Sequence, residues 1–182
     1  MTRIIGGTVG GRTLSVPRGR ATRPTSDRVR EALFNLLDAR GLPGGVAVLD
    51  AYAGSGALGL EAASRGASRV VCVESHRPTA RLIEGNARGL GLDVHVRAMS
   101  VAQFASTREE PFALVLADPP YPMTESELSS DLAALAAGGL LEPGGLLVVE
   151  RSIRSPEPSW PAAVAFEAVR RYGETTLWLA SC

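Results

Sequence analysis

The chain has 182 residues, 45% of them hydrophobic, a length that suits one domain able to fold without disulfides or metal ions. Its 19 basic and 19 acidic residues cancel, so the net charge alone indicates no partner. The two cysteines, Cys72 and Cys182, provide neither a disulfide framework nor a metal-binding spacing. No signal peptide is visible, and no apolar run approaches the ~20 residues of a membrane span. We therefore expect a cytoplasmic monomer that binds neither metal nor membrane.

The positive charge is concentrated at the N-terminus. Residues 1–30 contain seven arginines and one acid, Asp27, a net charge of +6, whereas residues 31–182 carry −6. A basic arm on an acidic body favours an anionic partner, although a solvated tail is the alternative. All 19 basic residues are arginine, which suits planar contacts with phosphates and bases.

The first elements form a hairpin and a helix. Residues 3–16 alternate apolar and polar side chains around two glycine pairs, a pattern that predicts a β-hairpin. After an Arg- and Pro-rich loop, Thr25 or Ser26 can cap a helix whose apolar face is formed by Val29, Leu33, Leu36 and Leu37. The glycines and proline of residues 41–45 end this helix.

From Val46 onward, short apolar runs alternate with helix-length segments, which predicts a parallel sheet covered on both faces. The expected helices span 57–65, 77–90 and 125–137. The expected strands are Val46–Ala51, Arg69–Glu74, Val94–Met99, Ala113–Ala117 and Leu146–Glu150, followed by an antiparallel hairpin of Phe166–Tyr172 and Thr175–Ala180. Five parallel strands closed by a hairpin match the Rossmann-like, seven-stranded sheet of S-adenosylmethionine methyltransferases better than a six-stranded dinucleotide domain.

A glycine-rich loop follows the first parallel strand. Gly54, Gly56 and Gly59 form a G-x-G-x-x-G pattern that opens a helix, where glycine lets backbone approach a ligand closely. Glu74 lies 20 residues past Gly54 at the end of the next strand, where a carboxylate can accept hydrogen bonds from two ribose hydroxyls. Together these features predict a ligand that contains a nucleoside.

Asp50 indicates which nucleoside-containing ligand the loop binds. It lies four residues before Gly54, and its carboxylate would repel a pyrophosphate bound on the loop. The ammonium and sulfonium groups of S-adenosylmethionine would instead be attracted to Asp50. A capping role for this carboxylate is the alternative. We favour S-adenosylmethionine as the cofactor.

Asp118, Pro119, Pro120 and Tyr121 follow the fourth strand, at the carboxyl edge where open α/β sheets bind ligands. Two consecutive prolines exclude regular structure and remove two backbone donors, which leaves a rigid corner. Asp118 and the Pro119 carbonyl can accept the two N–H groups of an exocyclic amine while Tyr121 stacks on its ring. The corner thus predicts methyl transfer to a base nitrogen, with a simple turn as the alternative.

These motifs resemble the RsmD-type 16S rRNA guanine-N2 methyltransferases, a branch of the amino-directed nucleic-acid methyltransferases. The resemblance runs from residue 3 to about 179 and is carried by Arg3–Gly7, Arg23–Asn35, Leu49–Gly59 and the Asp118–Tyr121 corner. It implies methylation of a guanine amine, gripped by Asp118 to Tyr121, in 16S rRNA of the small ribosomal subunit. It also implies cofactor contacts at Asp50, Ala51, Gly54, Gly56 and Glu74.

The adenine contact departs from the broader superfamily, where many members carry an acid after the third strand. This chain has Ala98, Met99 and Ser100 there, so the backbone at Ala98 or Met99, or the Ser100 hydroxyl, would take that role.

We divide the chain into a basic arm and loop (1–24) and a methyltransferase domain (25–182). The expected RNA-binding residues of the arm are Arg3, Arg12, Arg18, Arg20 and Arg23.

Several rival functions share some of these features. A DNA adenine-N6 or cytosine-N4 methyltransferase would have the same corner but usually needs a sizeable recognition insert, for which 182 residues leave no room. A methyltransferase of protein glutamine amides would not need the basic arm. Asp50 and the double proline argue against an NAD-dependent oxidoreductase, and a non-enzymatic RNA-binding module would not need the corner.

Overall fold

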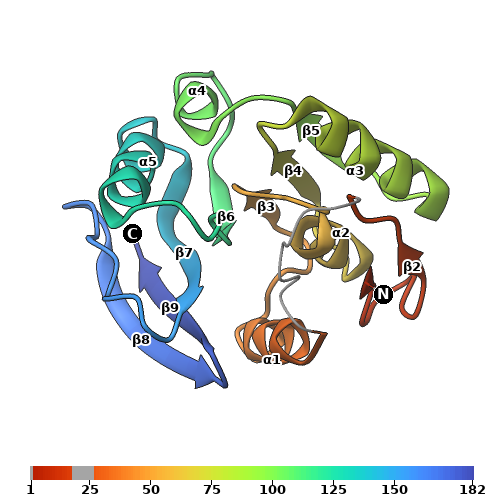
Figure 1. The fold of residues 1–182 in the computed structure, drawn as a ribbon, viewed down its shortest axis with the longest axis horizontal. Helices are drawn as coiled ribbons and strands as arrows, with labels where there is room; N and C mark the ends of the chain where they lie inside the picture. The colour runs from red at the N-terminus through yellow and green to blue at the C-terminus, as the bar shows by residue number, and fades with distance from the viewer. Residues whose placement is uncertain (1, 18–26) are drawn as a thin grey trace.

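The computed structural model describes residues 2–17 and 27–182, so the proposed cap residues Thr25 and Ser26 lie outside it. A seven-stranded sheet forms its centre, in the order β5-β4-β3-β6-β7-β9-β8 (Figure 1). Its strands are β3 (Ala47–Asp50), β4 (Arg69–Val73), β5 (His95–Arg97), β6 (Phe112–Ala117), β7 (Leu141–Ser152), β8 (Ala165–Tyr172) and β9 (Thr175–Ser181). The helices are α1 (Asp27–Asp38), α2 (Ala57–Ser64), α3 (Arg77–Leu90), α4 (Val101–Ala105) and α5 (Glu125–Ala137).

The strand order reverses at β3. The first five strands of this sheet are parallel, and β3 pairs with β4 on one side and with β6 on the other. Asp50, the last residue of β3, is in register with Cys72 of β4 and Leu116 of β6. In open α/β sheets, the ligand crevice lies at the carboxyl ends of the strands where the order reverses. The topology therefore predicts the site at the ends of β3 and β6.

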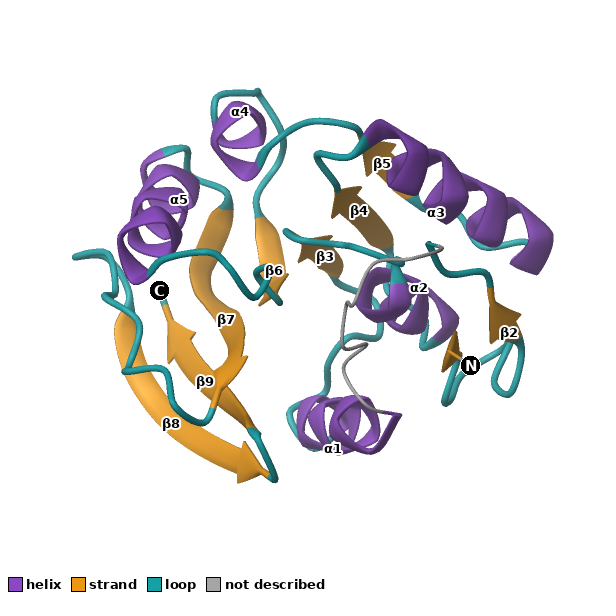
Figure 2. Cartoon of the chain, viewed as in Figure 1, coloured by secondary structure: helices purple, strands orange, loops and turns teal. Residues whose placement is uncertain are grey.

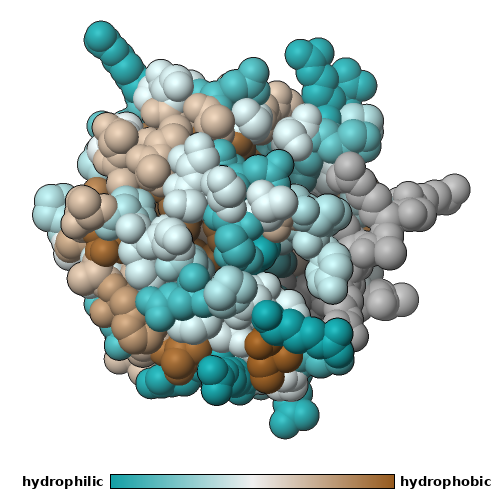
Figure 3. Space-filling model, turned by 60° about the vertical axis from the view of Figure 1, so that its left-hand side comes forward, coloured by the Kyte–Doolittle hydropathy of each residue, from teal (hydrophilic) through white to brown (hydrophobic). Residues whose placement is uncertain are grey.

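Helices cover both faces of the sheet (Figure 2). Alternate strand residues point to opposite faces, so Leu49 packs with α4 and α5, whereas Val48 packs with α1, α2 and α3. On the side of the molecule that Figure 3 brings forward, apolar residues lie scattered among polar ones. Within the described ranges, every helix is too short or too polar to cross a lipid bilayer.

The sheet and its closing hairpin confirm the sequence prediction, with small shifts at the ends of strands. β5 is shorter than the expected run of residues 94–99, and β7 is longer than the expected run of 146–150. Helix α4 was not predicted, because five residues are too few to show helical periodicity. Its start is nevertheless marked in the sequence: Ser100 and Gln103 form a reciprocal capping box.

The N-terminal arm is docked on the domain. β1 (Thr2–Arg3) pairs antiparallel with β2 (Thr13–Leu14), which confirms the expected hairpin. Ile4 and Leu14 are buried in a small cluster with Leu60 of α2 and Ala87 of α3. The described part of the arm is therefore not a solvated tail.

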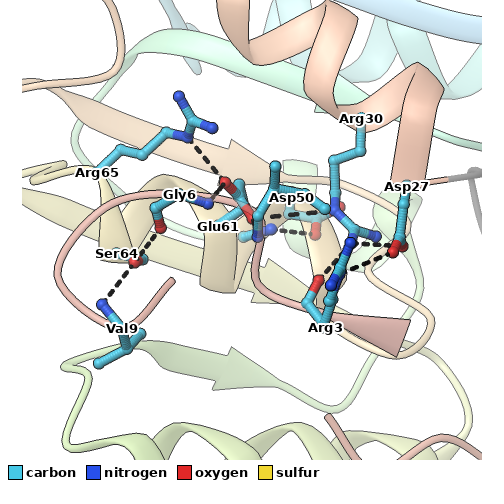
Figure 4. A network of polar contacts seen from close by, with 11 residues as sticks. Arg3, Gly6, Val9, Asp27, Arg30, Asp50, Glu61, Ser64 and Arg65 are labelled. Atoms are coloured by element: carbon cyan, nitrogen blue, oxygen red, sulfur yellow. Dashed lines mark hydrogen bonds and ion pairs between the residues drawn. The ribbon is translucent and has the colours of Figure 1, made fainter. Parts of the chain in front are cut away.

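Glu61 of α2 is the main polar anchor of the arm (Figure 4). Its side chain is fully buried, and its two carboxylate oxygens accept hydrogen bonds from the backbone N–H groups of Ile5 (2.6 Å) and Gly6 (2.8 Å). Arg65 donates to the same carboxylate at 2.8 Å. The buried Arg30 guanidinium lies 3.9 Å from Glu61 and donates to the Arg3 carbonyl. One carboxylate thus joins the arm to two helices.

We predict that Glu61→Gln lowers the free energy of unfolding by about 3 kcal/mol, because it removes the buried carboxylate beside Arg30 and leaves this buried guanidinium with the half-buried Asp27 as its described carboxylate partner. Urea unfolding followed by circular dichroism would measure the change. Glu84→Gln, at an exposed acid of α3, is the matched control and should stay within about 0.5 kcal/mol of wild type. Equal stability of the two variants would contradict the anchoring role.

Candidate functional site

The glycine loop connects β3 to α2 and is fixed by close contacts. Gly54 and Gly56 have φ values of 53° and 80°, in the left-handed region that favours glycine. A Cβ at Gly56 would lie 2.8 Å from the Ile83 side chain, and one at Gly59 would lie 2.3 Å from the Cys72 sulfur. The three glycines predicted from the sequence are therefore required by the turn and by the packing of α2 on the sheet.

Asp50 is fully buried beneath this loop. Its Oδ2 accepts a hydrogen bond from the backbone N–H of Gly59 at 2.8 Å, whereas the buried Oδ1 accepts none from the described residues. The pKa of Asp50 is raised to about 7, mainly by burial and to a lesser extent by the charges of Asp118 and Glu74, while the hydrogen bond from Gly59 acts in the opposite direction. A cation bound nearby would favour the ionised form of Asp50, so the site suits a positively charged ligand.

Glu74, directly after β4, connects the glycine loop to the start of α3. Its two carboxylate oxygens accept hydrogen bonds from the backbone N–H groups of Gly54 (3.0 Å) and His76 (2.7 Å). The next residue, Ser75, lines a cavity of about 450 Å³. The other residues that line this cavity are Arg77, Ala98, Met99, Ser100, Gln103 and Thr107.

The structure thus brings Ala98 and Met99, the expected adenine contacts, to a cavity beside Glu74. The third candidate for this contact, the Ser100 hydroxyl, is engaged locally. It accepts a hydrogen bond from the backbone N–H of Gln103 at 3.2 Å and so caps α4. The residues that line this cavity include no carboxylate; beside Ala98 and Met99 they carry the polar side chains of Arg77, Gln103 and Thr107.

The Asp118–Tyr121 corner follows β6 on the same edge of the sheet. Pro119 is buried, Asp118 is half-buried and Tyr121 is 86% exposed, which leaves its ring accessible to a ligand. The backbone N–H of Met123 donates to the Pro120 carbonyl at 2.9 Å and closes the turn. The charge of Asp118 contributes to the raised pKa of Asp50, so the corner and the end of β3 lie close enough to interact electrostatically.

Two side-chain pairs that sequence reasoning missed, Arg151–Glu125 and Tyr52–Asp131, hold the loops of this edge. Arg151, at the end of β7, donates to the Met123 carbonyl at 3.1 Å and to the Glu125 carboxylate at the start of α5. Tyr52 of the glycine loop donates to Asp131 of α5 at 2.7 Å, and burial raises the pKa of its hydroxyl well above the ordinary range. No spacing in the sequence relates these partners.

The proposed RNA-binding arginines fall into two groups. Arg3 is paired with Asp27 at 3.2 Å and keeps 60% of its side chain exposed, and Arg12 is exposed. Arg18, Arg20 and Arg23 lie outside the described residues. The structure therefore places two of the five, both on the docked hairpin.

Comparison with known proteins identifies the family. The model of the family described as Conserved hypothetical protein 95 matches residues 2–181. The Escherichia coli protein named Ribosomal RNA small subunit methyltransferase D is 38% identical over 173 residues, covering 88% of this chain and 79% of that protein. The chain belongs to the family described as Conserved hypothetical protein 95 and is a relative of this methyltransferase. The Bacillus subtilis protein named "Putative rRNA methyltransferase YlbH" is 35% identical over 162 residues, covering 85% of this chain and 86% of that protein.

Solved structures of relatives agree with the fold. A Thermus thermophilus protein, described as hypothetical, is similar with a TM-score of 0.84 at 36% identity, and the match covers 100% of both chains. The family match includes the arm as well as the sheet, since it begins at residue 2. The docked hairpin is thus part of the region that defines the family, not an addition to it.

Proposed function

We propose that this chain methylates the exocyclic N2 amine of a guanine in 16S rRNA, using the corner at Asp118–Tyr121. Its family and its fold make it an S-adenosylmethionine-dependent rRNA methyltransferase. The observation that carries the choice of an amine is the corner itself, with a carboxylate, a rigid backbone carbonyl and an exposed aromatic ring beside the cofactor edge. The choice of guanine rests on the resemblance of the sequence motifs to the RsmD type.

The residues at the edge of the sheet fit S-adenosylmethionine. Asp50 provides a buried carboxylate for a cationic ligand, with one oxygen that accepts no hydrogen bond from the described residues, and Glu74 lies where the two ribose hydroxyls would bind. The positive-φ glycines, Gly54 and Gly56, let the backbone at Ala51 and beyond approach the ligand. The cavity beside Ala98 and Met99 would take the adenine ring. When bound, the cofactor supplies an electrophilic methyl group.

The chain's own residues would position the amine and take its proton. The lone pair of a guanine N2 is delocalised into the ring, which makes the nitrogen a poor nucleophile. Hydrogen bonds from the amine to the Asp118 carboxylate and the Pro119 carbonyl would direct its hydrogens away from the reacting face. Stacking on Tyr121 would hold the ring, and such positioning supplies much of the acceleration. Asp118 accepts the proton as positive charge develops on nitrogen.

The proposed substrate is the small ribosomal subunit or an assembly intermediate of it, bound by the enzyme as a monomer. A base in a duplex must be flipped out at a cost of a few kcal/mol, whereas loop bases are more accessible. The chain has one small domain and a basic arm, which is little surface with which to select one base in free rRNA. Folded ribonucleoprotein offers shape as well as sequence, and equal activity on naked rRNA would contradict this proposal.

Cofactor affinity should depend on the charge of Asp50. With a pKa of about 7, its carboxylate is mostly ionised at pH 8 and mostly neutral at pH 6. We expect S-adenosylmethionine to bind roughly tenfold more weakly at pH 6 than at pH 8, as measured by calorimetry. Asp50→Asn should bind weakly at pH 8 and show little dependence on pH, whereas Glu84→Gln should follow wild type. A flat wild-type profile would exclude Asp50 as the cation's partner.

Asp118→Ala should lower kcat by roughly 100-fold or more while leaving S-adenosylmethionine affinity near wild type, because the variant loses an acceptor and a base but not the cofactor contacts. Transfer of labelled methyl to small subunits from a strain lacking this gene measures kcat, and mass analysis identifies the product nucleoside. Asp93→Ala, at an exposed acid, is the control. N2-methylguanosine supports the proposal; methylated adenine, cytosine or glutamine as the preferred product would overturn it.

The aromatic ring of Tyr121, rather than its hydroxyl, should matter. Tyr121→Phe keeps the stacking surface and should leave KM for subunits close to wild type. Tyr121→Ala should raise KM by about tenfold or more, since stacking of a base on an aromatic ring contributes ~1–3 kcal/mol. Because the side chain is 86% exposed, neither change should affect folding. Equal kinetics of the Ala and Phe variants would argue against stacking.

A further inference from the structure

Helix α3 presents three arginines on its outer face. Arg77, Arg81 and Arg88 are exposed and are spaced by four and seven residues, which places them on one side of the helix. The spacings correspond to about 6 and 10.5 Å along the axis. The opposite face of the helix is buried and consists of Thr79, Ala80, Ile83, Asn86 and Ala87. We call the three arginines the α3 stripe.

The charges of the α3 stripe are not neutralised within the described part of the chain. None of the three arginines forms a hydrogen bond or ion pair there, and Glu84, the single acid of the helix, pairs with none of them. Six other arginines (Arg30, Arg40, Arg65, Arg69, Arg97 and Arg151) contact carboxylates, whereas exposed arginines such as Arg108 and Arg171 are unpaired among the described residues but do not share one helix face. Glu84 lies on the same side of the helix, between Arg81 and Arg88, so this face offers an external ligand a net charge of +2.

The stripe connects two parts of the proposed enzyme. At one end, Arg77 lines the cavity beside Glu74 that would take the adenine ring. Toward the other end, the side-chain amide of Asn86 exchanges two hydrogen bonds with the backbone of Ser15 in the arm, at 3.0 and 2.9 Å. Figure 1 shows α3 running from the ends of β4 and β5 toward β2. The stripe thus extends from the arm to the mouth of the cofactor site.

We propose that Arg77, Arg81 and Arg88 form a track for the phosphates of the rRNA substrate, in addition to the contacts of the arm. This proposal rests on the proposed function, since it assigns part of the surface that binds that substrate. A guanidinium group can donate two parallel hydrogen bonds to one phosphate. With about 16 Å between the first and last arginine along the axis, one RNA strand can contact the whole stripe. Gly85 and Gly89 leave open space on the same stretch of helix.

The test uses the double variant Arg81→Gln/Arg88→Gln and leaves Arg77 unchanged, because Arg77 also borders the cofactor cavity. Binding to small subunits from a strain lacking this gene is measured by filter retention between ~50 and ~200 mM KCl at constant Mg²⁺. We expect the slope of log K against log salt to become shallower by about 1.5, as for two lost phosphate contacts. KM for subunits should rise several-fold, with kcat at saturation and S-adenosylmethionine affinity unchanged.

Arg171→Gln is the matched control, because Arg171 is exposed, forms no ion pair with described residues and lies in β8, the strand at the other end of the sheet from β5. It should keep the wild-type slope and KM. If the wild type methylates subunits but the double variant keeps the wild-type slope and KM, the stripe is not the track. Loss of cofactor affinity in the double variant would also overturn the assignment. If the wild type neither binds nor methylates subunits, the proposed function itself fails.

Discussion

The hydrogen bond from the Gly59 backbone to Asp50 is the contact on which the cofactor edge depends. At 2.8 Å it ties the first turn of α2 to the end of β3, and it is possible only because residue 59 has no side chain to collide with Cys72. Burial of the Asp50 carboxylate lowers the free energy of unfolding. Its raised pKa means that its contribution to folding stability falls as pH rises from about 4 to about 7. A buried acid that opposes folding at neutral pH is easiest to understand as part of a site for a cation.

Helix α2 joins this edge to the arm. Its first turn follows the glycine loop, and its last turns carry Glu61 and Ser64, which hold the backbone of residues 5–9. The helix has only eight residues, so it measures about 10 Å along its axis and both attachments lie within that length. The arm is therefore fixed relative to the cofactor loop, and RNA bound to the hairpin would be held in a defined position beside the reacting groups.

The sequence allowed prediction of those features that depend on local pattern. The apolar runs predicted the strands, the glycine spacing predicted the ligand-binding loop, and the double proline predicted the rigid corner after β6. Contacts between distant residues could not be read in this way: Glu61 binds a backbone 55 and 56 residues away, and Tyr52 pairs with Asp131 across 79 residues. Arg151 is likewise missed, since an arginine at the end of a strand has no spacing that reveals its partners. The roles of these residues depend on contacts that form only when distant segments pack together in the folded chain.

The charges divide the proposed complex into two zones. Asp50, Glu74 and Asp118 place carboxylates at the carboxyl edge, and the pKa of Asp50 is raised first by burial and then by the charges of Asp118 and Glu74. Such an edge repels phosphates but admits an uncharged base. The exposed arginines of α3 begin at this edge with Arg77 and continue toward the hairpin, where they can hold the backbone of the same RNA. The separation favours a bound state in which the strand stays outside on arginine while a single base enters, and that is the geometry that methylation of a base nitrogen requires.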